Sequence, residues 1–410
     1  MPWRETSPME QRLQFVREYE TELFTMTELA VQYGISRRTG YKWLARYDAD
    51  GVDGLRDHSR RPHHSPQATE ADLVETLLAL RRRHPRWGAK KLLAVAARRD
   101  PRAAWPSRST VCAWLKDRGL VVSPRRRERS PHAPESSLPP ITAVNEVWTT
   151  DFKGEFRTGD GRYCYPLTVR DGFSRFVLRC DGLLSRTTDA TRRGFERAFR
   201  AYGLPERIRS DNGSPFASPG LAGLSQLSVW WMRLGIQPER IAPGHPEQNG
   251  SHEQFHSVLK AATTRPPAPH CGAQQQRFRR FIHEYNEERP HEALGLQPPA
   301  SCYVPSRRGL PARLPPIDYA GHMEVRRVDH NGSISWKNAP LFVATALAGQ
   351  PVAFEEIDDG LWTLRFATVA LARYDERHRR FDPLPIALTG GRSASSAGSA
   401  PVLKNGKDNV

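Results

Sequence analysis

Four carboxylates stand in three short stretches of this sequence that also contain Asn, Gly or Lys. Asp151 lies in VWTTDFKG, Asp211 lies in IRSDNGSPF, and Glu247 and Glu253 both lie in PGHPEQNGSHEQFHSVLK. Carboxylates at strand ends, joined by one from a helix, can hold Mg²⁺, because hard cations prefer oxygen ligands and Mg²⁺ keeps positions open for phosphate and water. Two such ions about 3.5–4 Å apart activate a water or hydroxyl and stabilise the leaving oxygen. The stretches therefore predict a two-metal site for phosphoryl transfer.

The local sequence favours Glu253 over Glu247 as the third carboxylate. Between Asp211 and Glu247 lie 35 residues, and between Asp211 and Glu253 lie 41, but an insertion changes such a count freely. Glu247 falls in a loop with two prolines and two glycines, which is poorly suited to fixing a ligand. Glu253 stands at the beginning of an expected helix, on one face with Asn249, His256 and Lys260. We therefore predict that Asp151, Asp211 and Glu253 are the catalytic and metal-binding residues.

Three other residues of this helix have candidate roles. Lys260 lies on the same face as Glu253, and we expect it to contact a DNA phosphate. His252 and His256 either assist the reaction, contact DNA, or lie on a solvated helix face, and the sequence leaves these alternatives open.

The elements around the carboxylates predict an α/β core over residues 141–306. From about Asn145 the chain has three strand-like runs separated by Gly-containing turns, followed by alternating helical and strand patterns. This order is typical of an α/β domain with a mixed sheet. Residues 250–264 and 274–288 add two further helices.

Residues 1–60 are predicted to form a helix-turn-helix unit that reads DNA. Thr27 is expected to cap a short helix, Gly34 to permit the tight turn, and Ser36 to cap the second helix. The second helix of such a unit enters the major groove, and its candidate DNA contacts are Arg37, Arg38, Thr39 and Lys42. Gly40 is unfavourable in that helix, by up to about 1 kcal/mol relative to Ala. A plain helical hairpin is the alternative.

Residues 65–122 repeat this pattern, and a basic linker follows. Two amphipathic segments precede a third helix for which Ser107 is the expected cap, which predicts a second helix-turn-helix unit. Residues 123–140 are rich in proline and arginine, and they are expected to form a linker that contacts the DNA backbone. Its candidate contacts are Arg125, Arg126 and Arg127.

The C-terminal part has a different pattern. Residues 320–382 contain short strand-like runs joined by His-Asn-Gly and Asp-Asp-Gly turns, which predicts a small antiparallel β-barrel. Residues 383–410 are rich in Gly and Ser and are expected to be a disordered tail.

Charge and composition favour a polyanionic partner. The 410 residues include 61 Lys+Arg and 45 Asp+Glu, which gives a net charge of +16. Residues 81–129 carry 16 basic and three acidic residues, so this segment alone supplies +13. Such a concentration favours nucleic acid, although a basic solvated surface is an alternative. Five scattered cysteines without a CxxC pair, and no apolar run approaching a membrane span, predict a cytoplasmic protein without a disulfide framework or structural zinc.

The three acidic stretches, together with YNEERPHEALG at residues 285–295, resemble the integrase-core transposases of bacterial insertion sequences. This resemblance extends over nearly the whole chain and implies a multidomain α+β protein with a ribonuclease H-like catalytic core, as in retroviral integrases. The 35-residue spacing is the one known in that superfamily and points to Glu247. The family motif instead places the metal-binding glutamate after NGxx, at Glu253. Two Mg²⁺ ions, for which Mn²⁺ can substitute, are the implied cofactors.

The resemblance implies a DDE-type transposase with double-stranded DNA as partner. Such an enzyme binds the terminal inverted repeats of its element as a homo-oligomer, hydrolyses a phosphodiester to a 3′ hydroxyl, and joins that hydroxyl to target DNA. One alternative is a catalytically inactive DNA-binding regulator that retains the core as a scaffold. Another is a nuclease of the same fold without strand transfer. The presence of all three carboxylates argues against the inactive regulator, and the two DNA-reading units argue against the plain nuclease.

Overall fold

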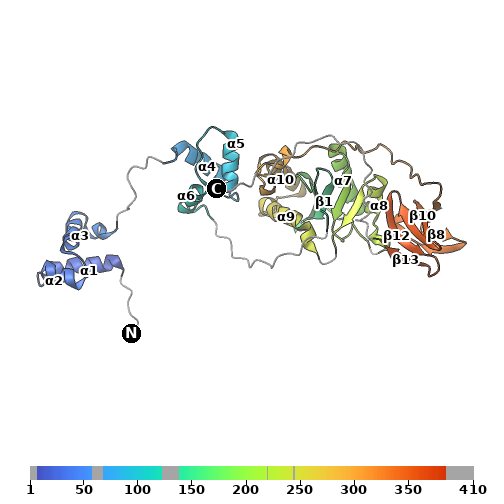
Figure 1. Ribbon diagram of the computed structural model, residues 1–410. Coiled ribbons are helices and arrows are strands. Elements are labelled where there is room, and N and C mark those ends of the chain that lie inside the picture. Colours follow the sequence, from blue (N-terminus) through green and yellow to red (C-terminus); the bar gives the residue numbers. More distant parts are fainter. Residues whose placement is uncertain (1–6, 58–67, 122–137, 219, 243–244, 385–410) are drawn as a thin grey trace, which may run out of the picture. The chain divides into compact units, whose positions relative to one another are not determined.

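The computed structural model describes residues 7–57, 68–121, 138–218, 220–242 and 245–384, and it divides the chain into two compact units, Met1–Glu70 and Ala71–Val410 (Figure 1).

The first unit contains three helices in the predicted helix-turn-helix order. They are α1 (Pro8–Glu20), α2 (Met26–Gln32) and α3 (Arg37–Asp50), and a 3-10 turn at Gly51–Leu55 follows. Ser36 caps α3 by accepting a hydrogen bond from the Thr39 amide, as predicted. The predicted cap of α2 was wrong, because Thr25 rather than Thr27 begins that helix, in a capping box with Glu28. Gly34 takes the expected turn conformation, with a φ of +61°.

Gly40 is explained by the packing of these helices. A Cβ at this position would lie 2.5 Å from Met26 Sδ and 2.9 Å from Phe15 Cζ. Both side chains are buried in the small core of this unit. The glycine that is unfavourable for the helix therefore permits α3 to approach α1 and α2 closely.

The second unit begins with three more helices, α4 (Ala71–Arg83), α5 (Ala89–Arg99) and α6 (Arg108–Asp117). Ser107 caps α6 through its side chain, as predicted. A core that includes Leu77, Leu92 and Val111 holds the three helices together. Ion pairs connect this trio to the rest of the unit, for example Arg83 to Glu288 at 2.8 Å.

The α/β part is built on a mixed sheet, as predicted. Its strands are β1 (Val147–Phe152), β2 (Phe156–Arg157), β3 (Tyr163–Asp171), β4 (Val177–Leu183), β5 (Arg207–Ser210) and β6 (Gln237–Arg240). The long strands run in the order β4-β3-β1-β5-β6, and β2 pairs with the first residues of β3. β1, β3 and β4 pair antiparallel, whereas β5 runs parallel to both β1 and β6.

Helices cover both faces of this sheet (Figure 1). α7 (Thr188–Tyr202) and α8 (Gln226–Arg233) pack on one face around an aromatic core that includes Trp148, Phe199 and Trp231. α9 (Gly250–Thr263) and α10 (Cys271–His283) cover the other face, and a π-helical turn at Glu284–Glu288 extends α10. The two centrally paired strands β1 and β3 therefore lie between two layers of helices, so their side chains alternate between two different cores.

The C-terminal strands do not close into the predicted barrel. An open antiparallel sheet has the order β13-β12-β11-β10-β7, and a separate hairpin pairs β8 with β9. The strands are β7 (Glu324–Arg327), β8 (Ser333–Trp336), β9 (Ala339–Phe342), β10 (Pro351–Asp358), β11 (Leu361–Phe366), β12 (Val369–Asp375) and β13 (Arg380–Pro383). The two predicted turns are confirmed, with Gly332 and Gly360 both at positive φ. The turns follow from local sequence. Closure of the sheet into a barrel depends instead on the partners of β8 and β9, and these two strands pair with each other rather than with the five-stranded sheet.

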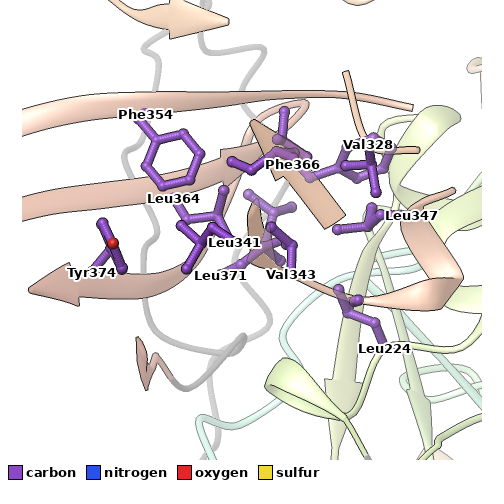
Figure 2. Close-up of a cluster of buried hydrophobic side chains, with 14 of the residues drawn as sticks. Leu224, Val328, Leu341, Val343, Leu347, Phe354, Leu364, Phe366, Leu371 and Tyr374 are labelled. Atoms are coloured by element: carbon purple, nitrogen blue, oxygen red, sulfur yellow. The ribbon is translucent and has the colours of Figure 1, made fainter. Parts of the chain in front are cut away.

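This sheet shares its core with the α/β part. Leu224 precedes α8 and Val229 lies within it. Both belong to the same buried cluster as Leu347 and Phe366. Figure 2 shows Leu224 beside Leu347 at the edge of that cluster. The C-terminal sheet is thus packed against the α/β part through apolar side chains.

Candidate active site

Strand β1 presents Asp151 toward α9. Trp148 and Phe152 contribute to the core under α7 and α8, so the alternation of a strand directs Thr149 and Asp151 to the opposite face. Asp151 is opposite Thr168 in the antiparallel pairing with β3. Asp151 is the last but one residue of β1, near the end of the strand.

Two histidines fix α9 on this face of the sheet. His252 is fully buried, with Nδ1 at 2.9 Å from Thr149 Oγ1 and Nε2 at 2.7 Å from Thr168 Oγ1. His256 Nε2 lies 2.8 Å from the same Thr168 oxygen. The alternative of a solvated helix face is therefore wrong for both histidines, because they fill the space between α9 and the sheet.

The hydrogens of this network can be assigned by counting donors. The Thr168 hydroxyl donates its one hydrogen to the carbonyl of Asp151 at 2.9 Å, so it must accept from both histidines at Nε2. Burial lowers the pKa of His256 to about 3, and burial lowers that of His252 as well, so both rings are neutral. The unprotonated Nδ1 of His256 then faces Asp151 Oδ2, at 3.6 Å.

We expect Thr168→Val to lower the free energy of unfolding by about 2–6 kcal/mol. The change keeps the shape of the side chain but leaves two buried imidazole N–H groups without an acceptor, at about 1–3 kcal/mol each. Thr150→Val is the matched control, because Thr150 is also fully buried and loses one hydrogen bond, to the Thr168 carbonyl. Urea unfolding followed by tryptophan fluorescence measures both, and equal losses would contradict the assigned network.

Asp211 stands immediately after β5, and its loop is anchored on both sides. Asn212 Nδ2 donates to the carbonyl of Ile241 at 2.9 Å, and the Gly213 amide donates to Asp211 Oδ1 at 3.2 Å. A Cβ on Gly213 would lie 3.1 Å from Asp211 Oδ2. The Asn-Gly pair thus shapes the backbone around this carboxylate.

Asp151 lies within the electrostatic influence of the other two predicted carboxylates. Burial, together with the charges of Asp211 and then Glu253, raises the pKa of Asp151 to about 7. Burial also raises the pKa of Asp211. Glu253 is exposed in the first turn of α9. Since ionisation of Asp151 and Asp211 is disfavoured in the protein alone, a bound cation would stabilise their ionised forms.

The side chains are not arranged as a closed metal cage. Within the described residues, no group of three His, Cys, Asp or Glu side chains is placed to hold a metal ion. The oxygen donors and their mutual repulsion nevertheless fit a hard divalent cation. Glu247 lies in a 3-10 turn at Pro246–Asn249 that leads into α9, and its side chain is outside the described residues.

Two cations near the carboxylates were missed from the sequence. Burial, followed by the charge of Lys260, lowers the pKa of Lys153, and Asp151 acts on it in the opposite direction. The guanidinium of Arg186 lowers the pKa of Asp211, against the larger effect of burial. Lys153 follows Asp151 by two residues, so strand alternation could have identified it. Nothing local to the sequence of Arg186 indicates its position.

The side chains predicted to contact DNA differ in their solvent exposure and hydrogen bonding. Arg37, Arg38 and Lys42 are exposed on α3, as Lys260 is on α9. The Thr39 hydroxyl lies 2.9 Å from that of Ser36, so it takes part in the helix cap. The linker arginines Arg125, Arg126 and Arg127 lie outside the described residues.

No helix in the described part of the chain is long and apolar enough to cross a membrane.

Family models match four stretches of the chain. Residues 11–84 match the leucine-zipper of insertion element IS481, and residues 323–382 match the C-terminal domain of IS481 family transposases. Residues 141–246 and 234–299 match two models of the integrase core domain. The described residues of the leucine-zipper match form separate short helices.

Two curated relatives are insertion-element proteins. The chain is 29% identical over 249 residues to the insertion element IS407 uncharacterized 31.7 kDa protein of Burkholderia multivorans. The aligned region covers 59% of this chain and 83% of that protein. The chain is 27% identical over 251 residues to the insertion element IS476 uncharacterized 39.2 kDa protein of Xanthomonas euvesicatoria, which covers 59% of this chain and 66% of that one.

Similar solved structures come from a viral integrase and from a viral intasome complex. The HTLV-2 integrase catalytic core domain in complex with magnesium is 16% identical with a TM-score of 0.32, over 42% of this chain and 100% of that one. A chain of the simian T-cell lymphotropic virus intasome in complex with PP2A regulatory subunit B56 gamma is 14% identical with a TM-score of 0.36, over 72% of this chain and 97% of that one.

Proposed function

We propose, on the premise that this chain belongs to the insertion-sequence transposases with an integrase core domain, that it cleaves the ends of its element and joins them to target DNA. The observation that carries the proposal is the grouping of Asp151, Asp211 and Glu253 at the junction of β1, β5 and α9, where the charges of Asp211 and Glu253 act on Asp151. No covalent bond between protein and DNA is required, because the 3′ hydroxyl released by hydrolysis is itself the nucleophile for joining.

Asp151, Asp211 and Glu253 would hold two Mg²⁺ ions, or Mn²⁺ in their place. Bound there, the ions would supply activation of the attacking water or hydroxyl and stabilisation of the leaving oxygen. The residues themselves position the reaction: β1 and β5 carry the two aspartates on a sheet held rigid between helices, and α9 carries Glu253. Thr168, His252 and His256 hold α9 against β1 and so set the place of Glu253 relative to Asp151.

The other parts of the chain would bind DNA. We propose that residues 1–60 and 65–122 read the terminal inverted repeats through α3 and its counterpart α6, and that the linker at 123–140 and the sheet at 320–382 contact the backbone. Arg37, Arg38 and Lys42 would contact the major groove, and Lys260 a phosphate near the carboxylates. A homo-oligomer would bring two element ends together in the cytoplasm of a bacterium.

A fragment of residues 1–140 is expected to bind element-end DNA with a steep dependence on salt. Residues 81–129 carry a net charge of +13, and each neutralised phosphate steepens log K against log salt by about 0.9. Fluorescence anisotropy between 50 and 200 mM salt, as rough limits, would measure the slope. A flat response would mean that the basic segment is only a solvated surface.

The function is tested by assaying Mg²⁺-dependent cleavage and joining of a duplex that carries the inverted repeats flanking the gene. Asp151→Asn and Asp211→Asn are expected to abolish both reactions while leaving end binding largely intact, since the proposed DNA-reading parts lie elsewhere. Binding without cleavage by the unaltered chain would favour an inactive DNA-binding regulator. Cleavage without joining would favour a nuclease.

A further inference from the structure

A cavity of about 390 Å³ lies between α5, α9 and residues 285–293, on a different side of α9 from the carboxylates. Four basic side chains line it: Lys91, Arg170, Arg175 and Arg289. The one carboxylate in that lining is Glu292, which pairs with Lys90 at 3.1 Å. The cavity therefore has a large excess of positive charge.

Arg170 is the most deeply placed of these cations. It is 2% exposed, and its guanidinium donates to the carbonyl of Ser251 at 3.0 Å and to the Ser251 hydroxyl at 2.8 Å. Its Nε has no hydrogen-bond partner. The neighbouring carboxylate of Asp171 accepts from the amides of Asn145 and Ser174 and from the Ser174 hydroxyl instead. A buried guanidinium whose hydrogen-bond partners are all neutral is costly unless an anion completes its surroundings.

The motif at residues 285–295 supplies the opposite wall. The guanidinium of Arg289 lies 5.8 Å from the centre of the Tyr285 ring, and no carboxylate pairs with it within the described residues. His291 Nε2 is buried without a partner. Burial, with the charge of Arg289, lowers the pKa of Lys91 to about 8, and burial with Arg289 and Lys91 lowers the pKa of His291 to about 3. The charge of Glu292 acts on Lys91 in the opposite direction, as that of Glu284 does on Arg289, so these carboxylates offset the repulsion among the cations only in part.

We propose that this cavity binds a phosphate group of a DNA strand. Arginine forms paired hydrogen bonds with phosphate oxygens, and three arginines with a lysine around one cavity provide the donors that such an anion accepts. A second cavity of about 680 Å³ shares Arg175, Ser251 and Ala293 with the first, so Arg175 borders both cavities; the second also includes Arg209, whose charge is paired with the buried Glu239. That the phosphate belongs to DNA rests on the proposed function, whereas phosphate binding itself does not.

The position on α9 gives this site a consequence for the reaction. Ser251, Phe255 and Val258 line the cavity, whereas Glu253 is on another side of the same helix. The helix is fixed to the sheet by His252 and His256, so a strand held in the cavity has a fixed position relative to the carboxylates. The cavity would therefore keep part of the DNA in register with the site of cleavage.

The test uses the full chain carrying Glu253→Gln, without divalent metal, so that binding is measured apart from cleavage. Inorganic phosphate is titrated by calorimetry, and an element-end duplex by anisotropy over a range of salt. Arg175→Gln and Arg289→Gln are each expected to weaken phosphate binding roughly tenfold or more, since a hydrogen bond to a charged group contributes about 1.5–3 kcal/mol. Each is also expected to reduce the salt slope for DNA by about 0.9.

Arg193→Gln is the matched control, because Arg193 is exposed on α7 and does not line the cavity. Thermal unfolding checks that Arg289→Gln folds, and the half-buried Arg175 provides an independent variant if it does not. Unchanged phosphate and DNA binding in a folded Arg175→Gln variant would overturn the proposal, as would an equal effect of Arg193→Gln. Loss of phosphate binding with an unchanged DNA slope would indicate a free phosphate compound and overturn the DNA assignment. If the unaltered chain fails to cleave DNA but binds phosphate through Arg175, only the proposed function fails.

Discussion

Glu253→Gln is expected to lower Mg²⁺-dependent cleavage by on the order of a hundredfold or more, while Glu247→Gln leaves it nearly unchanged. The amide keeps the shape of Glu253 but removes a negative ligand, which weakens the hold on both ions of a two-metal site. Glu253 is on the first turn of a helix that two buried histidines fix to β1, and its charge acts on Asp151. The measurement is the initial rate of strand cleavage at saturating Mg²⁺.

Glu247→Gln is a close control because the chemical change is the same and the position is six residues away. Glu247 belongs to the 3-10 turn that precedes α9. End binding by both variants should equal that of the unaltered chain, which separates a chemical defect from a folding defect. The assignment fails if Glu247→Gln is the variant that stops cleavage, since the 35-residue spacing would then be the better guide.

Asp151→Asn is expected to stabilise the metal-free protein at high pH. The pKa of Asp151 is raised from its ordinary value of 3.8 to about 7 by burial and by Asp211. Below pH 4 the carboxyl is protonated in both folded and unfolded chains and has no effect on stability. As pH rises from about 4 to 7, the unfolded chain ionises first, so the folded state becomes progressively less stable. Above pH 7 the cost is constant, on the order of 4 kcal/mol.

The measurement compares unfolding of the unaltered chain and Asp151→Asn in a chelator at several pH values. The advantage of the variant should grow between pH 4 and 7 and then level off, following the raised pKa of Asp151. Added Mg²⁺ should stabilise the unaltered chain and reduce that advantage, because the cation compensates the buried charge. If the stability difference between Asp151→Asn and the unaltered chain did not change with pH, the pKa of Asp151 would not be raised in the folded protein.

Much of the architecture follows from local sequence. The helix caps at Ser36 and Ser107, the turns at Gly34, Gly332 and Gly360, and the change from helical to strand periodicity near Asn145 all depend on short-range chemistry. The mixed sheet was predictable for the same reason, since strand and helix patterns alternate visibly. The candidate carboxylates were found because each stands beside residues that recur together in a known family, in addition to their positions at strand and helix ends.

Other features are decided only by contacts between distant segments. Gly40 is unfavourable within its helix. It is nevertheless accommodated because the fold packs Met26 and Phe15 so closely against it that a Cβ would not fit. His252 and His256 looked compatible with solvent, yet Thr149 and Thr168 from two strands enclose them. The C-terminal strands were recognisable singly, but whether they close into a barrel depends on pairing that local sequence does not specify.

The sequence by itself determined which residue types were present for phosphoryl transfer, because carboxylates, their flanking residues and helical spacing are properties of short segments. Only the tertiary structure decided that Asp151 lies in the field of Asp211 and Glu253, and that Arg170, Arg289 and Lys91 enclose one cavity. Those groups are separated by tens to hundreds of positions along the chain. Electrostatic effects depend on distance and burial in space, and folding sets both.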